Sequence, residues 1–540
     1  MKKYIIILSM ACTFASSCKD FLEEEMVASI TQDYFDTEQG LEQLIVNTYS
    51  ALRFKYGWVE GAVNFEIGSD ITSSGNWNSS SFHNDAWRAA GSGDHHMGKQ
   101  VDNLLGYYSG SQTLGAYPGI NNCNRAIESI AEGKALGQFA DDTKYASMRM
   151  AEAKFNRAWW YYMLVTQLGD VYMTLKSNNT VPENYNFQKA SSKDLYAQMI
   201  EDVRYGWDNL PETTNQKGRH TKYVAAHFLA KLYLQRAQAA QFENSSAEHL
   251  KMLFKGNVST DADSAIYFAT QVIESGYYRL EPNYWSLFDV KMNDYSNENS
   301  AEIIMAAGFG ANNGDNGRYG MRSQGYFTAT YVNTAYGLFR SWTYGSNNTG
   351  FKPTDFAYDV FTNKLADSRF EKSFRVEYET VYTAGDAKGT PELPFFAYDD
   401  PENQTVVWKQ SAVDYFNNHV KDLYNRPSWG GRTAVVNQHR SGTGDIGLCF
   451  IENTKATAIT LKKAEGQPYS GLWPRWVYDE DNDAYYYRRS PLSVSNTSGG
   501  GFGTPASGTN TGLEFGGNTL PGSKKHIDPN RSGMNQEYGT

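Results

Sequence analysis

Between residues 37 and 280, apolar side chains recur at the spacing of an α-helix in one segment after another. The longest such segment is 144–167, and Gly169-Asp170, which follow it, are expected to terminate the helix. Apolar residues three and four positions apart share one face of a helix, and that face must be buried against another element. Similar stripes are formed by Leu41, Leu44, Ile45, Thr48 and Leu52; by Ile120, Cys123, Ile127 and Ile130; by Leu195, Met199, Val203 and Leu210; by Val224, Phe228, Leu229 and Leu232; and by Ala262, Ala265, Ile266, Ala269 and Ile273. The pattern predicts a mainly α-helical scaffold over 37–280.

Residues that favour helix ends stand beside several of these stripes. Thr37 is suited to cap the first helix, and Ser191-Ser192-Lys193-Asp194 resembles a capping box before the stripe that starts at Leu195. The helices come in pairs, and stacked pairs of about 34 to 45 residues favour a tetratricopeptide-like array. No strict repeat can be aligned, so a generic helical bundle is the alternative.

After Glu281 the composition changes, and Gly, Asn, Ser, Thr and Tyr dominate. We expect a helix over 356–369 and strands over 375–381 and 456–461. An unstructured segment of this length is implausible inside a compact domain, so an irregular, loop-rich lobe with a few short strands is predicted for 281–523. A second polar stretch, 68–98, is predicted to be a loop inserted in the scaffold.

The first residues have the pattern of an export signal. Lys2 and Lys3 precede an apolar run that is too short to span a bilayer, and residues 1–17 are therefore predicted to be a signal peptide. Small residues directly before Cys18 resemble a bacterial lipobox, in which this cysteine carries the lipid anchor; a plain signal peptide with an incidental cysteine is the alternative. Residues 18–36 would be the anchor and an acidic tether, and such acidity resembles the signal for export to the cell surface.

Charge and motifs exclude several functions. The net charge is -11 and no run of Lys or Arg stands out, so a nucleic-acid partner is not expected. The sequence contains no GxSxG elbow, no phosphate-binding loop and no GxGxxG motif after a strand. Among 60 acidic residues some pair always suits a glycosidase, so such pairs are no evidence for one. We therefore expect no enzymatic activity and no cofactor.

Two clusters of possible metal ligands are weak. His83, Asp94, His95 and His96 lack the helical spacing of a metal motif. Asp479, Asp481 and Asp483 alternate like the start of a calcium loop, but Ala484 and Ser490 stand where such a loop requires Gly and Glu. No metal site is predicted, although a looser calcium site stays open. Cys123 and Cys449 are too few for a disulfide framework and are expected to be free thiols.

Several segments together resemble the SusD/RagB family of nutrient-uptake lipoproteins. Each is short, and their order and spacing carry the resemblance. They are Cys18 to Glu23, residues 151–162 (AEAKFNRAWWYY), residues 167–172 (QLGDVY), Gly218 to Thr221, Ala269 to Leu280, the strand-like Ser300 to Ile304, and Asp367 to Phe370. The resemblance implies a tetratricopeptide-like scaffold carrying an irregular binding lobe. It also implies an outer-membrane, cell-surface lipoprotein that binds a glycan and delivers it to a SusC-like TonB-dependent transporter. A peptide-binding, RagB-type member and a surface glycoside hydrolase are the alternatives.

Aromatic residues in polar stretches are the candidate ligand-binding residues. A sugar presents C–H faces to an aromatic ring and hydroxyls to polar neighbours. Two polar stretches that contain aromatic residues, one around 77–87 and one around 326–344, fall where the resemblance places the ligand site. The candidates are Trp77, Trp87, Tyr326, Trp342 and Tyr344. The alternative is that these rings only hold loops against the scaffold.

The end of the chain departs from the family pattern. Residues 523–531 resemble the strand before the last helical segment of the family, and the chain stops at Thr540. We therefore expect 524–540 to be the start of a truncated C-terminal segment that lacks a final helix pair.

Overall fold

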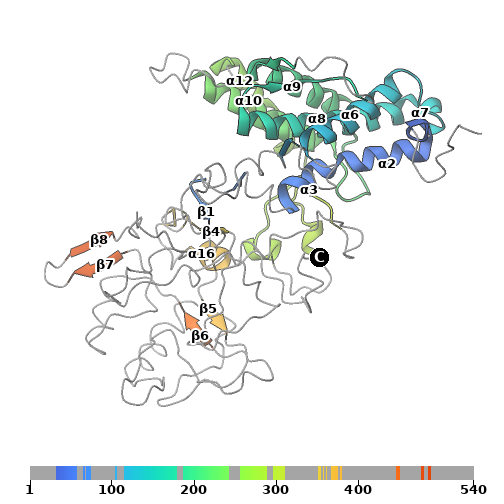
Figure 1. Ribbon diagram of the computed structural model, residues 1–540. Helices are drawn as coiled ribbons and strands as arrows, with labels where there is room; N and C mark the ends of the chain where they lie inside the picture. The colour runs from blue at the N-terminus through green and yellow to red at the C-terminus, as the bar shows by residue number, and fades with distance from the viewer. Residues whose placement is uncertain are drawn as a thin grey trace, which may run out of the picture.

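In the computed structural model of the chain, the helices lie side by side in one array (Figure 1). The described residues are 32–57, 65–66, 69–74, 104–105, 115–178, 187–241, 256–288, 296–309, 351–353, 357, 360–361, 367–374, 377–379, 446–449, 476–479 and 484–487.

The described residues are mainly helical. The longer helices are α2 (Glu38–Thr48), α3 (Ser50–Gly57), α6 (Ala116–Ala131), α8 (Thr143–Leu168), α9 (Ser192–Asn209), α10 (Lys222–Ala240) and α12 (Val258–Glu274). Short helical turns are η1 (Gln32–Asp36), α7 (Gln138–Asp141), η2 (Tyr284–Leu287), η3 (Ser296–Asn299) and α16 (Ser368–Ser373). The predicted mainly helical fold is thereby confirmed.

The described strands form four antiparallel two-stranded sheets. These pair β1 (Thr72–Ser74) with β4 (Phe351–Pro353), β2 (Val171–Tyr172) with β3 (Lys189–Ala190), β5 (Glu377–Glu379) with β6 (Ile446–Cys449), and β7 (Trp476–Asp479) with β8 (Ala484–Tyr487). Sheets of two strands bury little apolar surface and depend on neighbouring elements for stability. The helices are therefore the main source of core.

The helices pack in sequence order. α6 packs on α8, α8 on α9, α9 on α10 and α10 on α12, while α2 crosses both α6 and α8. Each helix thus contacts mainly its neighbours along the chain, as in stacked helical repeats. Among the described residues, no helix is long and apolar enough to cross a membrane.

Capping residues set the helix ends that the sequence predicts. The side chain of Thr37 accepts a hydrogen bond from the backbone N–H of Gly40 at 3.1 Å, and that of Ser191 accepts one from Asp194 at 3.2 Å. Each bond satisfies a backbone donor that has no partner within the helix. Gly169 follows α8 with φ of 72°, a conformation that glycine adopts at little cost, and so ends the helix.

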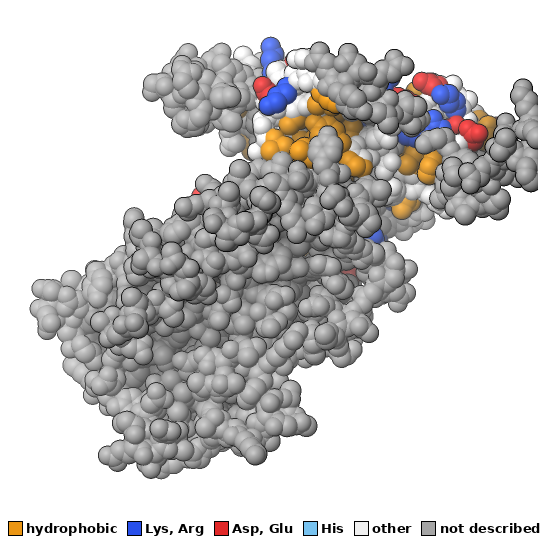
Figure 2. Space-filling model, viewed as in Figure 1, with side chains coloured by type: hydrophobic (Ala, Val, Ile, Leu, Met, Phe, Trp, Pro, Cys, Tyr) orange, Lys and Arg blue, Asp and Glu red, His pale blue; other side chains and the backbone are white. Residues whose placement is uncertain are grey.

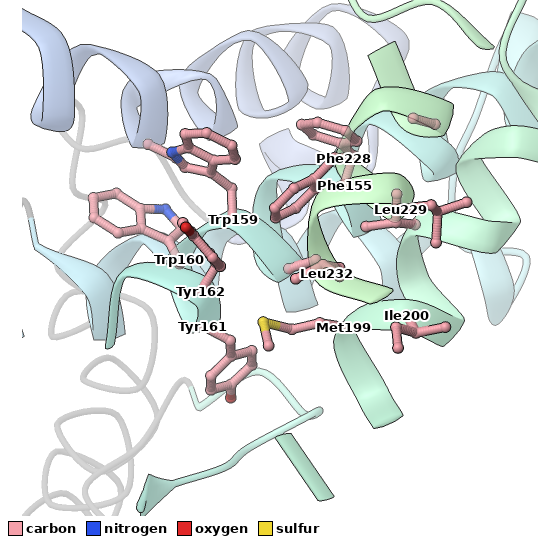
Figure 3. Packing of buried hydrophobic residues seen from close by; sticks show 14 of the residues in the cluster. Phe155, Trp159, Trp160, Tyr161, Tyr162, Met199, Ile200, Phe228, Leu229 and Leu232 are labelled. Atoms are coloured by element: carbon pink, nitrogen blue, oxygen red, sulfur yellow. The ribbon is translucent and has the colours of Figure 1, made fainter. Parts of the chain in front are cut away.

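The centre of the core is the second half of α8. Four consecutive residues, Trp159, Trp160, Tyr161 and Tyr162, are at most 6% exposed. Successive residues of a helix point in directions about 100° apart, so four buried in a row mean that protein surrounds the helix. Figure 3 shows these rings packed beside apolar side chains of α9 and α10.

The apolar stripe predicted for α12 does not coincide with the buried face of that helix. The sequence suggested that Ile266 and Ile273 lie on the buried face of α12, but they are 64% and 75% exposed. The buried face instead carries Asp261, Ala265, Phe268 and Val272. Hydrophobic side chains are also visible on the surface of the helical array in Figure 2.

Three local predictions are corrected and others lie outside the described residues. The first helix breaks at Tyr49, so Leu52 belongs to a separate helix, α3. Ser300 to Ile304 form turns and not a strand, and the helix expected over 356–369 is interrupted because Val360 and Phe361 are not helical. The strand expected within 375–381 is present as β5. The strand over 456–461 and most of the 68–98 loop lie outside the described residues.

Candidate functional site

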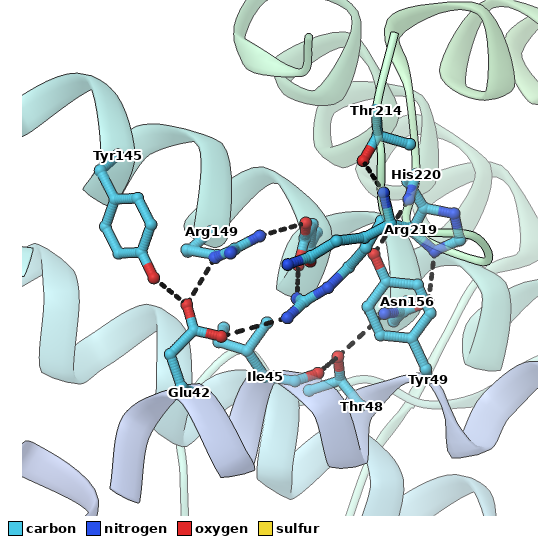
Figure 4. A network of polar contacts seen from close by, with 12 residues as sticks. Glu42, Ile45, Thr48, Tyr49, Tyr145, Arg149, Asn156, Thr214, Arg219 and His220 are labelled. Carbon is cyan, nitrogen blue, oxygen red and sulfur yellow. Dashed lines mark hydrogen bonds and ion pairs between the residues drawn. The ribbon is translucent and has the colours of Figure 1, made fainter. Parts of the chain in front are cut away.

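A network of four charged side chains joins α2, α8 and the turn before α10 (Figure 4). Glu42 accepts hydrogen bonds from Arg149 Nε at 2.6 Å and from an Arg219 guanidinium nitrogen at 3.2 Å. Glu152 accepts from Arg149 at 2.8 Å and from Arg219 at 2.6 Å. Two carboxylates and two guanidinium groups therefore alternate, and charge is balanced within the network.

The electrostatics of this network favour a structural role. Burial by itself raises the pKa of Glu42, but the hydrogen bond from Tyr145 and the charges of Arg149 and Arg219 outweigh it and lower the pKa. Glu42 is thus held ionised beside its basic partners, and it is not the proton donor that a catalytic acid must be. Burial raises the pKa of Glu152 despite the opposing charges of Arg219 and Arg149.

His220 lies beside this network and is closed off from solvent. Its Nε2 is 2.9 Å from Asn156 Oδ1, and Asn156 donates to Thr48 Oγ1 at 2.8 Å. The imidazole lies between the rings of Tyr49 and Phe155, with centroids 4.5 and 4.0 Å away. Burial lowers the pKa of His220 to about 3, so it is neutral at physiological pH. The histidine joins α2, α8 and the turn before α10 and, at 1% exposure, has no access to a substrate.

A second buried network explains polar residues in the 151–162 segment. Arg157 donates two hydrogen bonds to Asp202 on α9, at 2.8 and 2.7 Å, and a third to Asn124 on α6, at 2.8 Å. Asn124 donates in turn to the backbone oxygens of Thr174 and Lys176. Hydrogen bonds from this segment therefore connect α8 with α6 and α9, and Asn124 connects α6 with the loop at 174–176. The apolar pattern in the sequence predicted the buried apolar residues of the segment and not these polar contacts.

A third group of side chains is partly exposed and differs in character. We call it the Lys55 cluster; it comprises Lys55 and Tyr56 of α3, Phe65, Glu66, Trp159 and Tyr162 of α8, and His227 and Lys231 of α10. Lys55 Nζ lies 5.1 Å from the ring centroid of Tyr56, 5.4 Å from that of Phe65 and 5.6 Å from that of Trp159. Lys231 Nζ lies 5.0 Å from that of Tyr162, whose ring is 5.7 Å from that of Trp159. Two ammonium groups thus rest on adjoining rings.

The charges of the Lys55 cluster are incompletely balanced. Burial and repulsion by Lys231 lower the pKa of Lys55 to about 8, against the attraction of Glu66. Burial raises the pKa of Glu66 despite both lysines. Neither lysine forms an ion pair among the described residues. Tyr56 is 42% exposed and His227 is also exposed, whereas Trp159 and Tyr162 are buried, so one edge of the cluster meets solvent.

The residues that the sequence singles out for function are not among those the structure describes. Trp77, Trp87, Tyr326, Trp342 and Tyr344 all lie outside the described residues, as does Cys18. The same is true of the histidine cluster at 83–96 and of the side chains around Asp481. Within the described ranges, no three His, Cys, Asp or Glu side chains are grouped so that they could hold a metal ion. Cys123 is buried as a free thiol, and burial raises its pKa.

The comparison with protein families concerns the helical part of the chain. Residues 20–234 match a SusD-like family model described as starch-binding and associating with the outer membrane. The helical part of the chain is thus similar to the SusD/RagB family. The resemblance predicted from short motifs is therefore confirmed. The expectation of a binding protein rather than an enzyme agrees with the family's description.

Curated relatives of the SusD/RagB family match about half of the chain. One is SusD-like protein P2 of Formosa agariphila, 24% identical over 54% of this chain and 50% of the relative. Another is a SusD-like protein of Bacteroides ovatus, 24% identical over 56% of this chain and 49% of the relative. The chain spans about half the length of the curated relatives it matches.

Solved SusD-like structures are also similar. A laminarin-binding SusD-like protein is 20% identical, with a TM-score of 0.43 over 63% of this chain and 66% of its own. Surface glycan-binding protein A from Bacteroides uniformis is 17% identical, with a TM-score of 0.43 over 65% and 67% of the two chains.

Proposed function

We propose that the protein is a surface-exposed outer-membrane lipoprotein that binds a glycan and delivers it to a TonB-dependent transporter. The observation that carries this proposal is the match of residues 20–234 to a starch-binding, outer-membrane family. The signal-like residues 1–17 and the lipobox-like approach to Cys18 are consistent with export and anchoring.

The helical array supplies a rigid base for such a site. In its two charge networks each carboxylate is paired with an arginine, whereas the Lys55 cluster is partly exposed and its lysines form no ion pair among the described residues. Binding residues held by a rigid scaffold lose little conformational freedom when a ligand binds. We propose Trp77, Trp87, Tyr326, Trp342 and Tyr344 as the aromatic platform for the sugar rings.

Replacing Trp77 or Trp342 with alanine should weaken glycan binding by about 1–3 kcal/mol, because a truncated aromatic contact costs about this much. Calorimetric titration against a panel of plant and algal oligosaccharides, with a thermal melt of each variant, measures both effects. Trp207→Ala is the control, since its ring packs on Tyr223 and Phe268 in the core. It should lower the melting temperature and leave affinity unchanged.

The titration also tests the alternatives. Unchanged affinity with reduced stability in Trp77→Ala and Trp342→Ala would show that these rings only hold loops. Binding of peptides and of no polysaccharide would favour the RagB-type function. Release of reducing ends by the purified protein would contradict a pure binding role.

Replacing Cys18 with alanine should abolish lipid attachment, because the thiol that carries the lipid is lost. Labelling cells with a radioactive or clickable fatty acid and separating their membranes measures this. A Cys12→Ala variant is the control, since Cys12 lies inside the predicted signal peptide. Equal labelling of Cys18→Ala and the unaltered protein would contradict the anchor.

A further inference from the structure

The two lysines of the Lys55 cluster differ from the basic side chains of the two charge networks described above. Arg149, Arg157 and Arg219 each contact carboxylates at 2.6–2.8 Å, and Lys154 lies 3.5 Å from Asp202. Lys55 has no such contact among the described residues. It and Lys231 are instead carried on faces of rings, which stabilise a cation without neutralising it.

This arrangement is unfavourable for the protein alone. Removing an ammonium group from water costs free energy unless an opposite charge compensates. The nearby acid, Glu66, compensates only in part, since burial opposes its ionisation. A negative group bound between the two lysines would supply the missing charge and would form charge-assisted hydrogen bonds.

An accessible aromatic ring adjoins this positive charge. Tyr56 is 42% exposed, and its ring centroid lies 5.1 Å from Lys55 Nζ and 6.4 Å from the ring of Trp159. An exposed tyrosine offers an apolar face and a polar hydroxyl, which together suit the C–H face and the hydroxyls of a sugar. Ring and cation are thus within the span of one monosaccharide.

We propose that the Lys55 cluster is a binding site for an acidic saccharide, whose ring lies on Tyr56 and whose carboxylate lies between Lys55 and Lys231. The inference rests on the proposed glycan-binding function and names a class of ligand for it. The site is formed by α3 and α10 across α8.

The test compares an oligogalacturonate with a neutral galacto-oligosaccharide of the same length by calorimetric titration of the full chain. The oligogalacturonate should bind at least about tenfold more tightly, and Lys55→Met and Lys231→Met should each weaken its binding about tenfold, the effect of losing one charge-assisted contact. Lys55→Arg, which keeps the charge, should retain most of the affinity. Lys222→Met is the matched control. Lys222 is on the same helix as Lys231, and its Nζ lies 4.3 Å from the ring centroid of Trp207 of α9. This variant should leave the affinity for the oligogalacturonate unchanged.

Each other outcome has a defined meaning. Equal binding of acidic and neutral saccharides, or equal losses in Lys55→Met and Lys222→Met, would overturn the acidic site and leave the proposed function intact. Binding of neither saccharide would overturn the acidic site, and the proposed function would then be contradicted only if the whole oligosaccharide panel also failed to bind. Inorganic sulfate that binds as tightly as the oligogalacturonate would show a simple anion site to which the Tyr56 ring contributes nothing, and would also overturn the proposal. Thermal melts of each variant separate lost binding from lost folding.

Discussion

Replacing Arg157 with methionine is expected to destabilise the protein by about 3–5 kcal/mol, because the change removes the closest charge partner of the buried Asp202. Asp202 is fully buried and Arg157 is 3% exposed, and two hydrogen bonds of 2.7 and 2.8 Å join them. Lys154 Nζ, 3.5 Å from Asp202 Oδ1, offers only a single and longer contact in place of the two short bonds of the guanidinium. The free energy of unfolding from urea denaturation measures the loss.

A double variant separates the cost of an orphaned charge from the value of the pair. Arg157→Met with Asp202→Leu should recover most of the stability, since an apolar pair of similar volume is often as stable as a buried ion pair. Lys134→Ala is the control, because its contact with Glu132 is exposed and should leave the denaturation midpoint unchanged. A loss in the double variant as large as in Arg157→Met would show that the hydrogen bond to Asn124, and not charge, dominates.

Replacing Trp160 with alanine should cost about 3–5 kcal/mol, the usual effect of removing a large buried ring. Trp160 is among the largest fully buried side chains and packs on Phe54 of α3. Its indole also lies against Gly119 of α6, where an added Cβ would be 2.1 Å from Nε1. Gly119→Ala alone should therefore destabilise by about 1–3 kcal/mol through overpacking.

The effects of the two substitutions on the free energy of unfolding should not be additive, because the clash caused by Gly119→Ala is with the indole that Trp160→Ala removes. In the Trp160→Ala background, Gly119→Ala no longer meets the indole and should add little further loss or recover part of it. Gly206→Ala on α9 is the control: its nearest neighbours would be 3.4 Å away, in ordinary contact, so it should be neutral or slightly stabilising. Strictly additive losses at Gly119 and Trp160 would contradict this close packing.

Local sequence signals account for most of the helical array. Caps such as Thr37 and Ser191 and the terminator Gly169 act within a few residues, so their effects can be inferred without knowledge of the fold. The stripe in 144–167 is wide enough that nearly any neighbour would bury it. The same local reasoning led to the wrong face of α12, because its moderately apolar residues lie all around the helix and only the position of α10 decides which are buried.

The sites depend on residues that are distant in sequence. Lys55 and Lys231 are brought together only by the packing of α3 and α10 on α8, and nothing in the sequence near either one indicates the other. His220, Asn156 and Thr48 likewise join three helices. The composition and motifs of the chain determined its class, its mainly helical fold and the family it resembles, because these follow from local spacing. Which polar groups are paired, and which charges are left for a ligand, was decided only by the tertiary structure, since burial and distance set the strength of every such contact.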